Sequence, residues 1–271
     1  MYDKIFRPKI VTLSNGKTVL EKRSRVPFIL ILLTLAIIIS VEFTNFNLIV
    51  LLNRWQEFFV IVGEMFPPKW EILPGLWQPL MDTIKMSLLG SIGGSIVAMP
   101  SAVLASSNIV KNKVIVTLSK IILSVLRTLP TLVSALIATF IFGLGTMAGT
   151  VAIFLFTVAY VGKLLYEQIE NADMGPFEAM ESLGMTRIQS FRYAIIPQVL
   201  PNYISTSLFC FEGNIRYAAI LGYVGAGGIG LLLNERLGWR DYSSVGVILL
   251  SLIITVYIIE NISEHFRKKL T

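Results

Sequence analysis

The chain has 271 residues, of which 54% are hydrophobic and only 15% are charged. A soluble domain carries about 25% charged residues, so this composition excludes an ordinary soluble protein and indicates an integral membrane protein. The net charge of +6 does not indicate nucleic-acid binding, because the lysines and arginines gather at the ends of apolar runs, where membrane topology places them. We therefore expect membrane lipid around the chain and no nucleic-acid partner.

The first predicted membrane helix is the uncharged run 26–41, and a span needs about 20 mostly apolar residues. A long polar tail precedes it and no small-residue cleavage site follows it, so we expect an uncleaved span and not a secretory signal. The second span is expected within the uncharged run 86–110. This run contains Gly90-x-x-x-Gly94, a small-residue pair that lets two helices approach closely, either within the chain or between two copies.

The next uncharged stretch, residues 128–162, would form a helix of about 52 Å, which is too long for one span. We expect a hairpin that breaks at the glycines of 143–149. The third span then begins near Val114 and is kinked by Pro130. The remaining spans are expected near three ranges: 147–166, 198–221 and 245–259. Six membrane helices result, so the predicted fold is an all-α, polytopic membrane protein.

Basic residues near the span ends predict the orientation of the chain in the cell membrane. The tail 1–25 holds seven lysines and arginines against two acidic residues, whereas the loop 42–77 holds two against four glutamates. Both termini, the loop near Lys111 and a polar insert after the fourth span are therefore expected on the cytoplasmic side. The predicted organisation is a cytoplasmic tail (1–25), a transmembrane domain (26–264) and a second cytoplasmic tail (265–271).

The polar insert covers residues 171–197 and interrupts an otherwise apolar part of the chain. Pro176 suits the first position of a helix, where its missing N–H costs nothing. Gly184 suits the left-handed position just past a helix end. A first short helix is therefore expected over 176–183.

A second short helix is expected over 187–196 in the same insert. Thr186-x-x-Gln189 forms a capping box that starts it, and Pro197 is expected to end it. The two helices would form a rigid helix–turn–helix elbow on the cytoplasmic face, suited to docking a partner. The alternative is a well-capped loop without a partner.

The insert resembles the "EAA" loop of ATP-binding-cassette importer permeases, Glu-Ala-Ala, three residues, Gly, nine residues, Ile-x-Leu-Pro. Three positions depart from the pattern, each by one apolar residue for another: Met180, Ala194 and Ile196. In that family the loop is the coupling helix, which fits a cleft on a separate ATPase subunit. The resemblance implies an ATPase-coupling loop formed by the matched positions and one neighbouring arginine: Glu178, Ala179, Gly184, Arg187 and Pro197.

Four other segments resemble the phosphonate-type permeases: "MFPPKW" (65–70), "PLMDTIKMSLLGS" (79–91), "LRTLPTLVSALI" (126–137) and "VGAGGIG" (224–230). The resemblance spans roughly residues 60 to 265. It implies the permease subunit of an ATP-driven importer for a small phosphorus oxyanion, phosphonate first, with phosphite, phosphate, methionine or a vitamin as alternatives. It also implies an external binding protein, an ATPase subunit that uses the ATP, and a second permease copy or similar chain. No cofactor is expected on this chain, which has no G-x-x-x-x-G-K-[ST] phosphate loop.

Charged residues inside the predicted spans are candidates for the translocation pathway. Glu212 and Arg216 lie four apart, hence on one helix face, and form either a neutralised structural pair or part of the pathway. Arg127 either extends toward the cytoplasm or attracts an anion.

Gly225, Gly227 and Gly228 are the remaining pathway candidates. They belong to a run that satisfies G-x-G-x-x-G, but a dinucleotide site would need a preceding strand, and here a membrane helix precedes. We expect a close-packed, flexible turn beside the external mouth, whose backbone N–H groups could meet an anion.

Two other function classes fit the sequence less well. A membrane-embedded enzyme acting on lipid phosphates needs clustered carboxylates, histidines or a metal site. The chain has one cysteine, Cys210, one histidine, His265, and scattered carboxylates, so we expect no catalytic residues, no metal ligands and no enzyme. An ATP-independent transporter or channel would have no use for the capped elbow.

Overall fold

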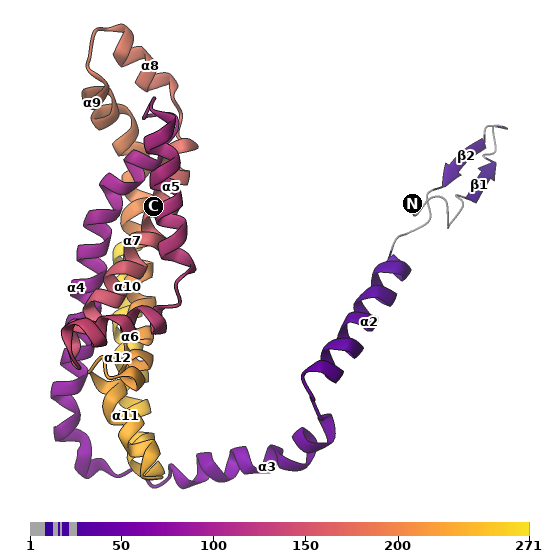
Figure 1. Cartoon of the computed structure of the whole chain (residues 1–271), viewed down its shortest axis with the longest axis vertical. Helices are drawn as coiled ribbons and strands as arrows, with labels where there is room; N and C mark the ends of the chain where they lie inside the picture. The colour runs from indigo at the N-terminus through magenta and orange to yellow at the C-terminus, as the bar shows by residue number, and fades with distance from the viewer. Residues whose placement is uncertain (1–8, 13–15, 17, 22–25, 271) are drawn as a thin grey trace. The chain divides into compact units, whose positions relative to one another are not determined.

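The computed structural model of this chain describes residues 9–12, 16, 18–21 and 26–270. Contacts divide it into two units, residues 1–60 and 61–271. In the first unit, strands β1 (Lys9–Thr12) and β2 (Thr18–Glu21) pair antiparallel, and α2 (Val26–Phe43) follows (Figure 1). The predicted first span is confirmed as α2, a helix long and apolar enough to cross a membrane. The hairpin in the tail was not predicted.

Helix α3 (Leu48–Glu64) lies where a loop was predicted. It is not among the described helices that are long and apolar enough to span a membrane. Asn47 caps the helix, because its Oδ1 accepts hydrogen bonds from the N–H groups of Ile49 (3.0 Å) and Val50 (3.3 Å). Asn47 was therefore a helix-start signal that the sequence reading missed.

The second unit is a bundle of helices. Its elements are, in chain order, η1 (Trp70–Ile72), α4 (Leu73–Ala105), α5 (Lys113–Thr128), α6 (Thr131–Phe142), α7 (Thr146–Glu170), α8 (Gly175–Ser182), α9 (Arg187–Ser190), the π-helical turn η2 (Phe191–Ile195), α10 (Ile196–Leu221), η3 (Gly222–Val224), α11 (Ile229–Gly238) and α12 (Tyr242–Arg267). Helices α4, α7, α10 and α12 run along the bundle, with α8 and α9 at one end and α11 toward the other (Figure 1).

The number of membrane spans depends on how two bent pairs are counted. Among the described residues, four helices are long and apolar enough to span: α2, α4 with η1, α7 and α12. The pair α5 and α6 is bent by 91°, and the helix that runs from α9 through α10 is bent by 50° against α11. Six spans result if each pair counts as one. The all-α class is confirmed, apart from the hairpin in the tail.

The predicted small-residue pair brings α4 against α7 within one chain. A β-carbon added at Gly94 would lie 2.6 Å from Cβ of Thr157, and one added at Gly90 would lie 2.7 Å from Cγ2 of Ile153. Real β-carbons are never that close, so both positions need glycine for this helix approach. Of the two alternatives for the pair, contact within the chain is correct.

Pro130 produces a break and not a mild kink. Leu129, before it, adopts an extended conformation (φ −74°, ψ 119°), because the proline ring disfavours helical geometry in the preceding residue. Pro130 then caps α6. The hairpin between α6 and α7 turns at Gly143 and Gly145, both with positive φ, as predicted.

Pro197 does not end the second helix of the insert, contrary to the prediction. The N–H of Ile196 bonds to the carbonyl of Phe191, five residues back, and this wide turn joins α9 to α10 without interruption. Pro197 lies in the first turn of α10, where a missing N–H costs little. The second part of the insert, from Arg187 onward, is therefore one helical piece with the span that follows it.

Candidate functional site

The turn between α8 and α9 has the geometry that the sequence predicted. Gly184 has φ of 89°, and its N–H bonds to the carbonyl of Glu181 at 3.0 Å. The N–H of Met185 reaches back to the carbonyl of Met180 at 3.1 Å, which completes a Schellman motif. Gly184 is confirmed as the left-handed residue just past a helix end.

The capping box that starts α9 is also confirmed. Thr186 Oγ1 accepts a hydrogen bond from the N–H of Gln189, and Gln189 Oε1 accepts one from the N–H of Thr186, at 3.4 and 3.0 Å. Both ends of the turn are therefore closed by their own hydrogen bonds. We call the segment 175–190 the elbow.

The inner face of the elbow is anchored in an apolar core. Phe177 of α8 is only 2% exposed. It packs in a cluster of residues from α4, α7, η2 and α10: Ala102, Leu165, Ile169, Ala194, Ile195 and Val199. Burying a phenylalanine side chain stabilises by about 1.5–3 kcal/mol, so this contact holds the elbow firmly on the bundle.

The outer face of the elbow carries unprotected apolar side chains. Leu183 and Ile188 are 83% and 82% exposed, and Glu178 and Ala179 lie exposed on α8. Large apolar side chains gathered at the tip of a polar segment are typical of a protein-docking surface. The sequence reading missed Leu183 and Ile188, although an apolar residue inside a polar insert was a visible signal.

Two of the residues predicted for the coupling loop, Arg187 and Pro197, are not part of that outer face. Arg187 Nε lies 3.0 Å from Oε1 of Glu181, and its Nη1 donates to the carbonyl of Ile109 at 2.9 Å. Its guanidinium thus ties the elbow to the loop between α4 and α5. Pro197 is exposed but lies in α10.

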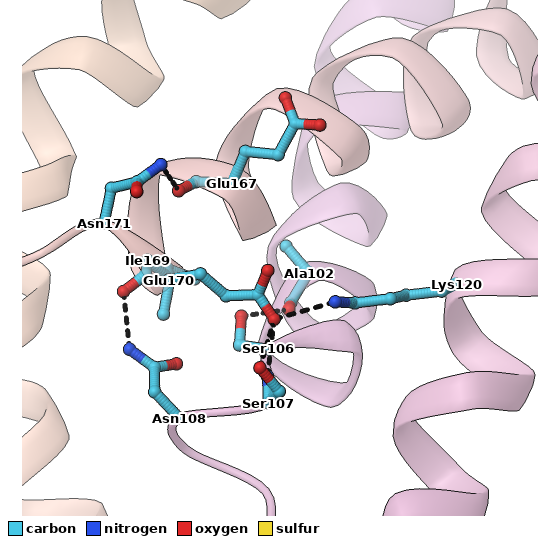
Figure 2. Close-up of polar contacts among 9 residues, drawn as sticks. All are labelled: Ala102, Ser106, Ser107, Asn108, Lys120, Glu167, Ile169, Glu170 and Asn171. Atoms are coloured by element: carbon cyan, nitrogen blue, oxygen red, sulfur yellow. Dashed lines mark hydrogen bonds and ion pairs between the residues drawn. The ribbon is translucent and has the colours of Figure 1, made fainter.

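The loop between α4 and α5, residues 106–112, meets the end of α7 in a network of polar contacts (Figure 2). Glu170 Oε1 accepts hydrogen bonds from the N–H (2.8 Å) and Oγ (2.6 Å) of Ser107 and from Lys120 Nζ (2.8 Å). Asn108 Nδ2 donates to the carbonyl of Ile169 at 2.7 Å. No sequence pattern pointed to this network, because its members are distant in the chain.

Glu212 and Arg216 do not form the pair that the sequence offered as one alternative. Arg267 Nη2 of α12 lies 3.0 Å from Oε1 of Glu212, whose side chain is 3% exposed. The sequence reading considered only a partner on the same helix, and the partner comes from the last turn of another. Glu212 is therefore part of a structural contact between α10 and α12.

Arg216 instead lines a cavity of about 340 Å³ between α7 and α10. The other lining residues are mainly aromatic and small: Phe156, Tyr160, Phe209, Cys210, Gly213 and Tyr217. Phe156 stacks on Tyr160 with ring centroids 5.7 Å apart and meets the edge of Tyr217 at 5.5 Å. Neither Arg127 nor the three candidate glycines line this cavity. Arg127 is exposed in the last turn of α5.

The candidate glycines form a closely packed turn between α10 and α11. A β-carbon at Gly225 would lie 2.2 Å from Cδ2 of Leu144, and the carbonyl of Gly225 accepts a hydrogen bond from Gly145 at 2.9 Å. Added β-carbons at Gly227 and Gly228 would come within 3.0 Å of Thr146 N and 2.5 Å of Thr83 Oγ1. Close packing of the turn is confirmed, and helix α11 follows it.

The buried contact between Glu212 and Arg267 leads to a stability prediction. Glu212→Leu leaves the guanidinium of Arg267, whose side chain is 26% exposed, without its carboxylate. Breaking a fully buried pair costs about 3–5 kcal/mol, and access of water to the arginine places the loss here below that range. We expect a clearly lower unfolding temperature of the purified protein in detergent. The double variant Glu212→Leu/Arg267→Leu should recover most of the loss. A double variant as unstable as the single one would contradict the assignment.

Comparison with known proteins identifies the family. The family model described as "Binding-protein-dependent transport system inner membrane component" matches residues 98–270. The phosphite transport system permease protein PtxC of Stutzerimonas stutzeri is 32% identical over 218 residues, which cover 80% of this chain and 79% of that protein. The phosphate-import permease protein PhnE of Mycolicibacterium smegmatis is 30% identical, over 78% of this chain and 40% of that protein.

The fold is also that of a solved transporter. A chain of the inward-facing MetNI methionine ABC transporter superposes with a TM-score of 0.64 at 22% identity, and the match covers 74% of this chain and 97% of that one. The family model alone covers more than half of the chain. This chain therefore belongs to the family of binding-protein-dependent transport system inner membrane components, and it is a multi-pass transport permease and not an enzyme.

Proposed function

We propose that this permease serves an ATP-driven importer for a small phosphorus oxyanion, which an external binding protein delivers and a separate ATPase subunit powers. Relatives named for phosphite and phosphate transport support this class, as does the putative cryptic phosphonate transport system permease protein PhnE2 of Escherichia coli, which is 36% identical over 43% of this chain. Phosphonate was the first expectation from the sequence. We propose the whole class, because its members share a tetrahedral anionic centre.

The outer face of the elbow is the observation that carries the proposal. Leu183 and Ile188 project from a turn whose inner face is fixed by Phe177. These two apolar side chains are largely exposed, so packing within this chain does not account for them. A cleft on an ATPase subunit would bury it, and the exposed carboxylate of Glu178 would lie at the rim.

The cavity of Arg216 is proposed as part of the translocation pathway. A charged side chain in a membrane span is costly unless it faces protein or water. We therefore propose that a second permease, a copy of this chain or a similar one, covers this face of α7 and α10, so that the pathway runs between the two. Arg216 would attract the anion, and Tyr160 and Tyr217 would narrow the passage.

The elbow proposal is tested by variants of its outer face. Ile188→Glu should remove an apolar anchor and Gly184→Val should strain the turn by about 1–2 kcal/mol, since a β-branched residue is disfavoured at positive φ. Glu178→Lys tests the same surface by charge. We expect each variant to insert normally and to lose most of its co-purifying ATPase when it is co-expressed with the ATPase subunit of its importer.

The control is Trp239→Glu, which changes an aromatic residue after α11 that is 77% exposed, close to the exposure of Ile188; this variant should retain the ATPase. The proposal is wrong if wild-type permease binds no ATPase, or if all three elbow variants bind it and transport normally.

The role of Arg216 is tested by uptake. Arg216→Met removes the charge and keeps the length, so uptake of phosphite, phosphate and methylphosphonate should fall by roughly tenfold or more, about 1.4 kcal/mol. Arg216→Lys should retain part of the uptake, and Arg54→Met in α3 should retain all of it. Normal uptake by Arg216→Met removes this residue from the pathway. If the wild type takes up methionine but none of the three oxyanions, the proposed substrate class is wrong.

The cytoplasmic position of the elbow and of both termini is a further part of the proposal. Single cysteines at Lys69 and at Gly175, both exposed, in a Cys210→Ser background should react from opposite faces of the membrane. An impermeant thiol reagent applied to intact cells should label the first and spare the second. Labelling of both positions would contradict the orientation.

A further inference from the structure

Three consecutive residues of the loop 106–112 contact three parts of the segment that carries the elbow. Ser107 donates from its N–H and Oγ to Glu170, at the end of α7. Asn108 Nδ2 donates to the carbonyl of Ile169 and lies 3.3 Å from the sulfur of Met174, just before α8. The carbonyl of Ile109 accepts from Arg187, the first residue of α9. The loop is therefore bonded to the end of α7 on one side of the elbow's first helix and to the first residue of α9 on the other.

Glu170 is the member of this network that joins three elements. Its Oε1 accepts from the loop through Ser107 and from α5 through Lys120, at distances of 2.6–2.8 Å, while its backbone closes α7 (Figure 2). The side chains of Lys120 and Glu170 are 33% and 24% exposed, so the pair is partly shielded from water. Charge-assisted hydrogen bonds of this length are strong and directional.

Lys120 is itself held in place along α7. Its Nζ lies 5.1 Å from the ring centroid of Tyr166, one turn before Glu170. Two residues of α7, Tyr166 and Glu170, thus contact the same ammonium group. A movement of the end of α7 relative to the loop would therefore displace Lys120, which lies in the middle of α5.

The far end of α5 leads to the 91° break at Leu129 and Pro130, and α6 then packs against α7. On the other side, the elbow continues without interruption into α10. The two helices that line the cavity of Arg216, α7 and α10, are therefore both connected to the elbow. Helix α5 packs directly against α7, where Leu123 lies beside Val158 and Gly162, and the loop and Lys120 add polar contacts at the end of α7 that leads to the elbow.

We propose that Glu170 is a positioning residue for coupling: through Ser107 and Lys120 it makes α5 and its break move with the elbow when the ATPase moves it. The inference rests on the proposed function. It assigns a role to a carboxylate that lies outside the docking face and outside the cavity of Arg216. Coupling between distant sites is carried by such contacts between rigid elements, and its strength is measurable by removing them.

The test measures substrate uptake per ATP hydrolysed in proteoliposomes with the ATPase and the binding protein. Glu170→Gln keeps an acceptor for Ser107 and removes the ion pair, and Lys120→Met removes the ion pair from the other side. We expect both variants to co-purify with the ATPase as the wild type does. Uptake per ATP should fall by roughly fivefold or more, the lower range of allosteric couplings. Lys120→Arg, which keeps the cation, should stay near the wild type.

The double variant Glu170→Gln/Lys120→Met decides whether the two residues act as one unit. If they do, its loss should match that of either single variant, because the second change has nothing left to remove. The control is Glu264→Gln, which breaks a pair of the same length, 2.8 Å, with Lys268, one turn later and just past the end of α12. This variant should couple normally.

Three outcomes overturn the inference: normal coupling in both single variants, multiplied losses in the double variant, or loss of the ATPase from the variants, which would make the network a support for docking only. If Glu170→Gln does not accumulate in the membrane, Lys120→Met and Lys120→Arg decide the question alone. A wild-type permease that neither binds the ATPase nor transports contradicts the proposed function instead.

Discussion

Close packing of α4 against α7 is the constraint on which the arrangement of the other elements depends. Lipid provides no hydrophobic drive for two apolar helices to associate, so contact area and backbone proximity must hold them. Gly90 and Gly94 allow that proximity, and no larger residue fits. Because α4 and α7 run together, their ends at Ala105 and Glu170 lie together as well. The loop 106–112 can then reach the elbow, so the position of the proposed coupling network follows from the packing of two spans.

The elbow combines exposed apolar side chains with a rigid backbone. Its outer residues are left exposed, whereas its frame is fixed by a Schellman motif, a capping box and the burial of Phe177. A docking surface on a rigid frame loses little conformational entropy on binding. It also passes on displacement instead of absorbing it. The same segment therefore suits recognition and transmission of force.

The parts of the fold that were predictable rest on local signals. Gly184 marks a helix end and the Thr186–Gln189 box marks a helix start, and each signal lies within a few residues of sequence. An apolar run of sufficient length likewise predicts a membrane span without any knowledge of the residues that pack against it. The misses depend on distant partners. Glu212 pairs with Arg267, far along the chain, and Glu170 with Lys120, and no spacing rule reports such contacts. Pro197 was wrongly predicted to end a helix, because the π-helical turn before it lets the helix continue past the proline. Helix α3 was missed because its start signal, Asn47, was not used.

The π-helical turn at Phe191–Ile195 sets the rotational phase between the elbow and α10. Each α-helical residue turns the chain by about 100°, whereas a wide turn accommodates one residue more for the same advance. The wide turn thus keeps the elbow and α10 in their relative direction although one extra residue lies between them. The same residues forced into a regular α-helix would rotate the elbow by about 100° about the axis of α10. That rotation would remove Phe177 from its cluster and Arg187 from the carbonyl of Ile109. The π-helical turn therefore lets a continuous helix and a firmly packed elbow exist in the same segment.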